Sequence, residues 1–335
     1  MPKSLRAFLQ YLVMIILTLA LLWLSLRGLE AGEGENKFDR IWKAWEGSSK
    51  GWLLAMVAVA YISHVMRAER WRMLLNPTGN RVGLGNSFLS LMVGYLVNLA
   101  IPRGGEISRC YNLLKLEKTP VEVSFGTVVV ERIVDVLSLV VVIALSFIVE
   151  WDKLIGFLQS LGIGGGQATP MKVPMWAYAA LIGVLVAGIV LYSLRRHPKL
   201  LSVIAGFRKG LLSVFQMQDK GLFLLYSVGI WFLYFLMSYC VIMAFDTTRE
   251  LGFSAVLTLF ALGAIAMAAP LPGGTGSYHT IVPLGLVVLY QLPQADAIAF
   301  VFIFHAWQTL TMIAGGIISL AISYVIIRWK EQPTK

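Results

Sequence analysis

Long apolar segments alternate with short polar ones along the whole chain. A helix that crosses the roughly 30 Å hydrocarbon core of a bilayer needs about 20 mainly apolar residues. Six segments meet this length, directly or with short extensions, and are predicted to span a membrane: Phe8–Leu26, Trp52–Met66, Val121–Val149, Met175–Leu194, Leu222–Phe245 and Ala295–Ile327. The pattern therefore predicts an all-α polytopic membrane protein.

Three further apolar segments are too short to cross a bilayer, and proline or glycine interrupts them. They are Phe88–Ile101, Ser254–Ala269 and Tyr278–Tyr290. Irregular backbone at membrane depth is tolerated only where protein buries it or where it lines a cavity. We therefore expect two re-entrant helical hairpins, over 86–118 and 254–291, each with a glycine-rich loop at its tip.

The two glycine-rich loops, 102–106 and 272–276, lie at matching places in the two halves of the chain. Each has a glycine pair shortly after a proline, and the apolar segments around the loops repeat at nearly the same offset. This layout predicts two inverted-topology repeats, 1–170 and 171–335. In transporters built this way, the binding site lies where the broken helices meet.

Composition and charge agree with a membrane location. The 335 residues are 58% hydrophobic and only 14% charged, whereas soluble domains carry about 25% charge. The net charge is +10, and Lys and Arg concentrate in the segments that the topology assigns to the cytoplasm. This bias fits the positive-inside rule, with both termini cytoplasmic in a cell (inner) membrane, and it disfavours nucleic-acid binding. The two cysteines have no metal-ligand or disulfide spacing, and we expect no metal and no cofactor.

Three charged residues, Glu131, Arg132 and Asp135, lie within the predicted span Val121–Val149. Glu131 is about 15 Å from the start of this helix and so near the bilayer midplane. A charge at that depth costs at least ~2.5 kcal/mol and normally faces a cavity or a partner. These residues are candidates for binding a lipid head group, and the alternative is an ion pair that only joins helices.

The first glycine loop combines flexible backbone with charge. We expect Gly104 and Gly105 to leave backbone N–H groups free for an anion, with Arg103 and Arg109 supplying positive charge beside Glu106. These groups suit a lipid phosphate. The alternative is a tight turn with ordinary basic residues of the inner leaflet.

The second glycine loop carries no Lys or Arg and predicts a neutral, hydrogen-bonding gate. In the second half, His305 with Gln308 one turn later matches the position of Glu131 in the first half, and it could equally be a packing residue. The gate candidates are Pro272, Gly273, Gly274, Gly276, His279, His305 and Gln308.

A basic cluster, Arg67, Arg70, Trp71 and Arg72, follows the second predicted span. Tryptophan is enriched at membrane interfaces and Lys and Arg in cytoplasmic loops. We therefore expect this cluster mainly to anchor the helix end at the cytoplasmic surface, and contact with lipid head groups is the lesser alternative.

Four motifs together resemble the transmembrane region of lysylphosphatidylglycerol synthases. They are Arg67-x-x-Arg70-Trp71, Asn98-x-x-x-Pro102-x-Gly104-Gly105-Glu106-x-x-Arg109, Glu131-Arg132-x-x-Asp135 and Pro272-Gly273-Gly274-x-Gly276. The resemblance implies a flippase-like domain that moves a phospholipid or polyprenyl-type lipid between leaflets. In the synthases a separate soluble domain makes the lipid. Lys335 closely follows the last span, so we do not expect synthase activity here.

The main hypothesis is therefore a membrane protein that binds an anionic lipid and moves it across the bilayer. No catalytic constellation stands out in the sequence. A membrane-embedded transferase that uses Glu131 or Asp135 as a base on a lipid phosphate remains an alternative. A third reading is a non-transporting subunit of a lipid-synthesis complex, and the expected partners are a membrane lipid, a second copy or a lipid-synthesis protein.

Overall fold

In the computed structural model, the described residues are 37–160, 198–269 and 271–331, with a few positions between 16 and 25. Within these ranges every regular element is helical, which confirms the all-α class. The helices are α2 (Lys37–Gly47), α3 (Lys50–Leu75), η1 (Asn76–Thr78), α4 (Leu84–Ala100), α5 (Gly105–Glu117), α6 (Val121–Val149), α7 (Trp151–Ser160), α9 (Pro198–Gln216), α10 (Lys220–Ala244), α11 (Gly252–Ala268), η2 (Pro272–Gly274), α12 (Ser277–Tyr290) and α13 (Gln294–Glu331).

Four described helical segments are long and apolar enough to cross a membrane. They are α3 with its η1 extension, α6, α10 and α13. Each contains or closely matches a span predicted from the apolar pattern. The other two predicted spans, Phe8–Leu26 and Met175–Leu194, lie largely or wholly outside the described residues.

The three short apolar segments correspond to α4, α11 and α12, and α5 completes two helical pairs, as the proline and glycine positions predict. Helices α4 and α5 pack against each other across the first glycine loop, and α11 and α12 do so across the second. Pro102 lies between α4 and α5, and Pro272 is the first residue of η2, so the missing N–H of each proline breaks no helical hydrogen bond.

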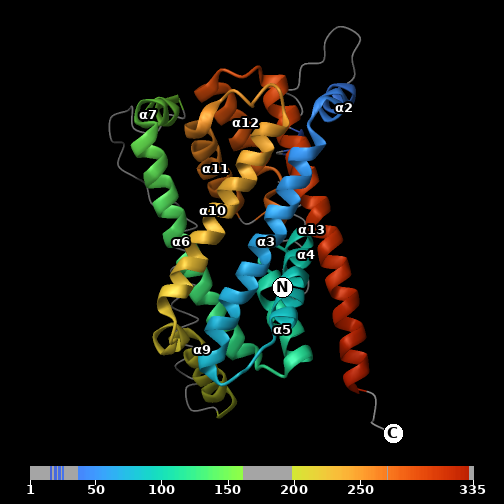
Figure 1. Ribbon diagram of the computed structural model, residues 1–335, viewed down its shortest axis with the longest axis vertical. Helices are drawn as coiled ribbons and strands as arrows, with labels where there is room; N and C mark the ends of the chain where they lie inside the picture. Colours follow the sequence, from blue (N-terminus) through green and yellow to red (C-terminus); the bar gives the residue numbers. More distant parts are fainter. Residues whose placement is uncertain are drawn as a thin grey trace.

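The two helical pairs lie toward opposite ends of the molecule (Figure 1). Helix α3 starts beside α2 at the top, and α13 ends at the bottom with the C-terminus. Helices α6 and α10 run the other way, because α6 ends at α7 at the top and α10 starts beside α9 at the bottom. Helices α3 and α10 pack together, α4 packs against α13, and α11 packs against α6.

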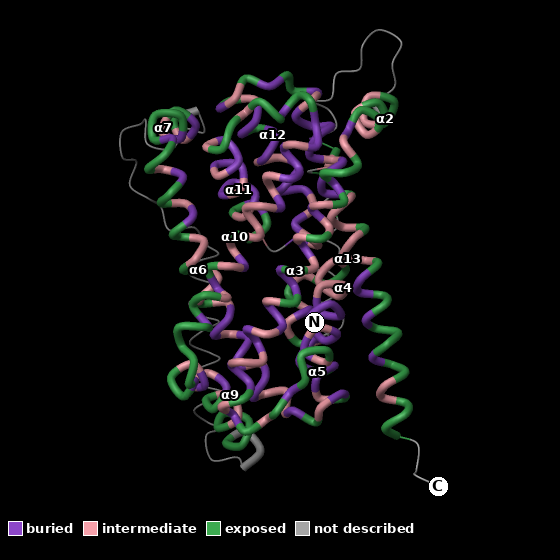
Figure 2. The backbone as a smooth tube through the Cα atoms, in the orientation of Figure 1, coloured by how far each residue is buried: buried purple, intermediate pink, exposed green. Residues whose placement is uncertain are grey.

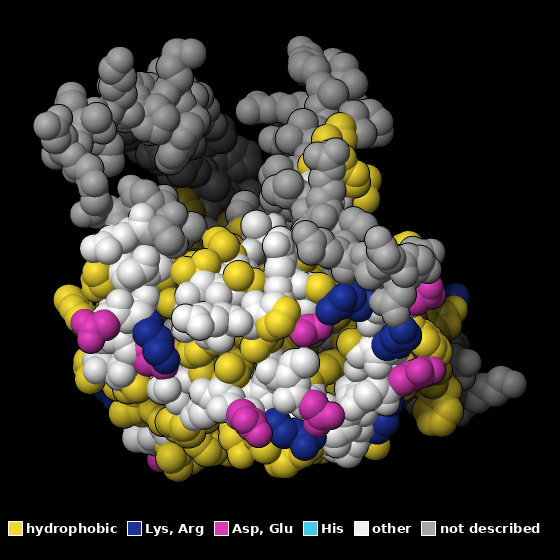
Figure 3. All heavy atoms as spheres, turned by 90° about the horizontal axis from the view of Figure 1, so that it is seen from above, with side chains coloured by type: hydrophobic (Ala, Val, Ile, Leu, Met, Phe, Trp, Pro, Cys, Tyr) yellow, Lys and Arg dark blue, Asp and Glu magenta, His cyan; other side chains and the backbone are white. Residues whose placement is uncertain are grey.

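The second halves of α6 and α13 carry exposed apolar side chains, and Figure 2 shows the exposed positions there, toward the top of α6 and the bottom of α13. Val140 and Val141 on α6 and Ile317 and Ile318 on α13 are all more than half exposed. Exposed aliphatic side chains on long helices suit a lipid-facing surface. At the end that carries α7 and α12, the visible acidic and basic side chains are instead interspersed (Figure 3).

Candidate functional site: a cavity between the two glycine loops

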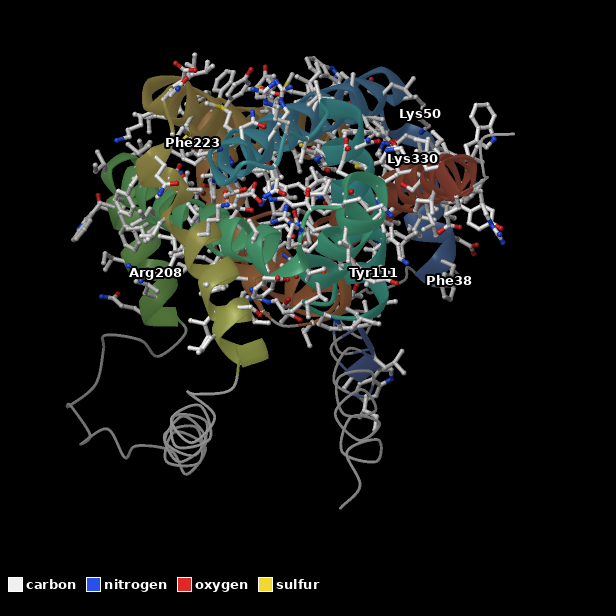
Figure 4. The ribbon with its side chains drawn as sticks, turned by 90° about the horizontal axis from the view of Figure 1, so that it is seen from below. Phe38, Lys50, Tyr111, Arg208, Phe223 and Lys330 are labelled. Atoms are coloured by element: carbon white, nitrogen blue, oxygen red, sulfur yellow. The ribbon has the colours of Figure 1, made fainter. Side chains whose placement is uncertain are left out.

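A cavity of about 470 Å³ lies between the two glycine loops. Its walls come from both halves of the chain. Among its lining residues are His64, Arg67, Tyr95, Asn98, Pro102, Arg103, Glu106, Arg132, Asp135, Trp231, Tyr234, Gly273, Gly274, Tyr278, Phe304 and Gln308. Figure 4, viewed from below, shows nitrogen and oxygen atoms of side chains gathered between the helices in the middle of the molecule.

Three arginines from three different elements line one side of this cavity: Arg67 of α3, Arg103 of the first loop and Arg132 of α6. Arg103 has a φ of 63°, which is uncommon for a residue other than glycine. Its Nη2 donates to the carbonyl oxygen of Ala268 at 3.2 Å, so the first loop touches the end of α11. The side chain of Arg132 is 38% exposed, although it lies about 16 Å along a spanning helix.

Two carboxylates pair with Arg67 and Arg132 of this set. Asp135 accepts hydrogen bonds from Arg67 at 2.5 Å and from Arg70 at 2.8 Å, and Arg132 lies 3.7 Å away. Glu106 lies 3.5 Å from Arg132 and joins α5 to α6. The ion pairs of Arg132 are therefore longer than the hydrogen-bonded pair of Arg67 with Asp135, and Arg132 lines the cavity.

A second layer of charge lies behind the cavity and does not line it. Glu131 is fully buried and accepts a hydrogen bond from Arg109 at 2.5 Å, with Arg70 at 3.6 Å. The Arg109 guanidinium also lies over the Trp71 ring at 4.6 Å. Arg109 and Glu131 thus support the site from behind, and a direct contact with a ligand would need them to move.

The second half supplies a wall without charged residues. Tyr278 and Phe304 pack edge to face, and Trp231 packs in the same way on Tyr234 and on Phe260 of α11. The Tyr234 hydroxyl accepts a hydrogen bond from Arg67 at 2.7 Å, which links the two walls. The cavity is therefore cationic on one side and aromatic on the other.

The first glycine pair does not form the expected anion cradle. The Gly105 N–H donates to the Asn98 side chain at 2.7 Å, and the Gly104 N–H donates to the carbonyl of Ile101. A Cβ on Gly105 would lie 2.2 Å from the carbonyl oxygen of Gly94. The physical reason for glycine here is close packing of α4 on α5, and neither glycine lines the cavity.

The two glycine loops approach each other at the cavity. Besides the contact from Arg103, Gly273 packs against Leu99 of α4, so both loops border one cavity. Gly273, Gly274 and Gln308 line this cavity as expected. Pro272, Gly276, His279 and His305 do not line it, but both histidines contact the second loop.

The prediction that Arg67, Arg70 and Trp71 anchor the helix at the membrane surface is wrong. Helix α3 continues to Leu75, well past the predicted end of the span, and all three side chains are buried inside the bundle. Arg72 alone is partly exposed there. One signal could have revealed this, because His64, Arg67 and Arg70 recur at intervals of three residues and so share one helix face.

Apolar spanning helices around an internal cavity with a cationic and an aromatic side define a polytopic helical membrane protein with a central chamber. The chain belongs to the family of the lysylphosphatidylglycerol synthase transmembrane region, which it matches over residues 8–316. This finding confirms the resemblance carried by the four motifs.

Three known proteins are similar to parts of the chain. A UPF0104 membrane protein of Methanocaldococcus jannaschii is 31% identical over 29% of this chain and 30% of its own length. A UPF0104 membrane protein of Methanothermobacter thermautotrophicus is 26% identical over 34% of each chain. The glycosyltransferase AglD of Haloferax volcanii is 26% identical over 80% of this chain but only 48% of its own length. No solved structure matches the chain with significance.

Proposed function

We propose that this protein binds an anionic phospholipid or lipid-linked intermediate in the central cavity and moves its head group between the leaflets. The observation that carries the proposal is the pairing of three arginines with an aromatic wall in one cavity inside the bundle. A guanidinium binds phosphate by charge and by paired hydrogen bonds. The aromatic wall suits the apolar part of the same molecule.

The charge balance around the cavity favours an anion. Among the described residues, five arginines meet three carboxylates: Arg67, Arg70, Arg103, Arg109 and Arg132 against Glu106, Glu131 and Asp135. The excess of two positive charges lies at membrane depth, where an unbalanced charge is costly. A phosphate in the cavity would offset this excess, since it brings one or two negative charges.

The cavity volume sets a limit on what enters it. About 470 Å³ lies within the usual ~300–1,000 Å³ of small-molecule sites, enough for a head group. The hydrocarbon chains of the lipid would stay outside, against the apolar faces of the spanning helices. Val136 of α6 lines the cavity and is also 58% exposed, so the cavity reaches the surface of the bundle beside α6.

An inverted repeat with six spans would explain how one cavity serves both leaflets. Equivalent helices make equivalent contacts, because α3–α4, α4–α5 and α5–α6 correspond to α10–α11, α11–α12 and α12–α13. The last span of each half packs on the first hairpin helix of the other half. We place the end of the molecule that carries α9 and the C-terminus on the cytoplasmic side of a cell membrane, in agreement with the charge bias of the sequence.

The match to a glycosyltransferase favours one alternative, a transferase that acts on a lipid phosphate. The chain covers about half of that relative, so the activity of the whole protein is not carried over. The carboxylates argue against a general base here, because Asp135 already accepts hydrogen bonds from two arginines and Glu131 is enclosed behind them.

Liposomes made with fluorescent phosphatidylglycerol and an impermeant quencher test the proposal. Protein-containing liposomes should lose nearly all fluorescence, whereas empty ones lose only the outer half. Arg132→Gln should slow the exchange, and Arg208→Gln, at an exposed arginine on α9 (Figure 4), should not. No exchange, or a chemically altered lipid, would overturn the proposal.

A further inference from the structure

Two contacting histidines hold the two ends of the second glycine loop. The His279 and His305 rings are 4.7 Å apart between centroids and nearly perpendicular. His279 Nδ1 lies 3.4 Å from the backbone N of Gly276, and His305 Nε2 lies 3.1 Å from the carbonyl oxygen of Gly273. Neither ring lines the cavity, but Gly273 does.

The partners of the two rings fix where their protons lie. A backbone N–H can only donate, so Nδ1 of His279 must accept and carries no proton in this arrangement. A carbonyl oxygen can only accept, so Nε2 of His305 must donate and carries a proton. The two histidines therefore respond differently to an added proton. His305 can gain one on its other nitrogen and keep its bond to Gly273, whereas His279 must lose its bond to Gly276.

The backbone of His279 is held by a neighbouring hydroxyl, and its ring is buried. Pro283, four residues later in α12, has no N–H for the His279 carbonyl, and the Ser25 hydroxyl donates to that carbonyl at 2.7 Å instead. His279 is 3% exposed, so a charge on it would have little water to stabilise it.

Among the described residues, no acidic side chain contacts either ring to balance a charge on it. The only titratable groups that contact the rings in the described part of the chain are the other histidine and Tyr278, which stacks on His305 at 5.6 Å. Arg103 reaches the carbonyl of Ala268, at the end of α11 that leads into the loop. Since both rings cannot carry charge side by side, the pair accepts at most one proton.

From this geometry we propose that the His279–His305 pair is a proton-binding site that controls the second glycine loop. With His279 neutral, both ends of the loop are held and the loop closes its side of the cavity. A proton on His279 Nδ1 makes this nitrogen a donor that faces the Gly276 N–H, so the hydrogen bond between them is lost. The Gly276 end of the loop is then released and the loop opens, while His305 keeps the Gly273 end attached. Only the coupling of this movement to lipid transport rests on the proposed function.

A cysteine in the loop tests the site without any assumption about lipids. Thr275→Cys, in a background where buried Cys110 and Cys240 are replaced, should react with a small charged thiol reagent in detergent. The rate is measured at about pH 8 and about pH 4, because a buried histidine without a counter-charge takes up a proton only below the usual histidine range. At each pH, this rate is divided by the rate of the same cysteine in a His279→Gln background. The ratio removes the effect of pH on the thiol itself.

The ratio should rise about 2- to 10-fold at the lower pH, the factor expected for the loss of one hydrogen bond. His279→Gln should fix the loop in its closed form, because the Gln side-chain oxygen can accept from Gly276 but takes up no proton. In His305→Gln the rise should persist, because His279 is still present. A ratio that does not change with pH would overturn the proposal, and so would a rise that disappears in His305→Gln.

Lipid exchange measured at the same two pH values separates this proposal from the proposed function. Faster exchange of fluorescent phosphatidylglycerol at low pH, absent in His279→Gln, would couple the loop to transport. A pH-dependent loop without lipid exchange at either pH would support the proton site and contradict the transport function.

Discussion

The two hairpins of this protein share a shape but differ in their chemistry. Each is a pair of short helices joined at a proline- and glycine-containing loop, and both loops border the same cavity. The first hairpin and its flanking helices carry Arg67, Arg103, Glu106, Arg132 and Asp135 at the cavity. The second contributes aromatic rings, backbone and Gln308.

This contrast teaches that backbone architecture and binding chemistry are set separately. Both loops need proline and glycine to break a helix at membrane depth, and that need says nothing about a ligand. The charges that would recognise a phosphate come from the first hairpin and the helices that flank it, so a ligand would meet the two halves of the chain in unequal ways. The head group of a lipid would face the first half of the chain, and the apolar part of the same lipid would face the second half.

The largest expected effect on stability comes from Glu131, the buried carboxylate in the first half of the chain. Glu131→Ala leaves Arg109 without its carboxylate partner inside the bundle and should cost about 3–5 kcal/mol of stability. His305→Leu, in the second half of the chain, removes one hydrogen bond between uncharged groups and should cost about 1 kcal/mol of stability. Thermal unfolding of the detergent-purified variants measures both. Equal losses would remove the contrast between the halves.

A smaller loss is expected at the glycine that packs the first hairpin. Gly105→Ala places a Cβ 2.2 Å from the backbone oxygen of Gly94, which cannot move aside as a side chain would. Overpacking of this kind costs about 1–3 kcal/mol. Gly85→Ala is the matched control, because no atom lies within 4 Å of its added Cβ. If Gly105→Ala folds as well as the control but loses lipid, the loop would bind phosphate directly after all.

Lipid affinity should depend on the first half more than on the second. Arg132→Gln should weaken binding of phosphatidylglycerol about tenfold, near 1.4 kcal/mol, because it removes one charge-assisted hydrogen bond to phosphate. The protein should still fold, since Asp135 keeps Arg67 and Arg70. Gln308→Leu should change affinity less than about twofold. Native mass spectrometry over a lipid titration measures both, and a larger effect of Gln308→Leu would reverse the assignment of the two walls.

The smallest effect concerns Glu150, which follows the end of α6 and joins it to the second hairpin. Burial alone would raise the pKa of Glu150, but hydrogen bonds from Tyr290, Lys153 and Thr258 outweigh it and lower the pKa below its usual value. A lowered pKa adds stability above the usual carboxyl range, and this stability is lost as the pH falls through the lowered pKa.

Acidification should therefore destabilise the protein by about 1 kcal/mol or less through this one residue. Glu150→Gln should remove that part of the acid sensitivity, and Asp152→Asn, at an exposed neighbour, should not. Unfolding temperatures at neutral and acidic pH make the comparison. An unchanged acid response in Glu150→Gln would show that the link between α6 and the second hairpin does not depend on this carboxylate.

The sequence was sufficient to predict the helices but not their contacts. Length and apolar character identify α6 and α13, and the Pro/Gly loops identify the broken helices. Asp135 could be assigned to the interior because its depth in an apolar helix demands a partner. Arg67 could not, because the apolar run of its helix ends at Met66 and only packing shows that the helix continues into the bundle.

The same limit applies to the glycines. A glycine pair after a proline fits an anion-binding turn and a tight helix–helix contact equally well. The position of Asn98, which accepts the Gly105 N–H, decides between them. That choice depends on the distance between two helices, which no local pattern contains.

The most direct test is the position of a lipid phosphate in the protein. Its structure determined in a lipid nanodisc that contains phosphatidylglycerol should show phosphate density within hydrogen-bonding distance of Arg132, between the two glycine loops. The lipid chains should leave the bundle beside α6. An empty cavity, with ordered lipid phosphates only at the two membrane surfaces, would contradict the central claim.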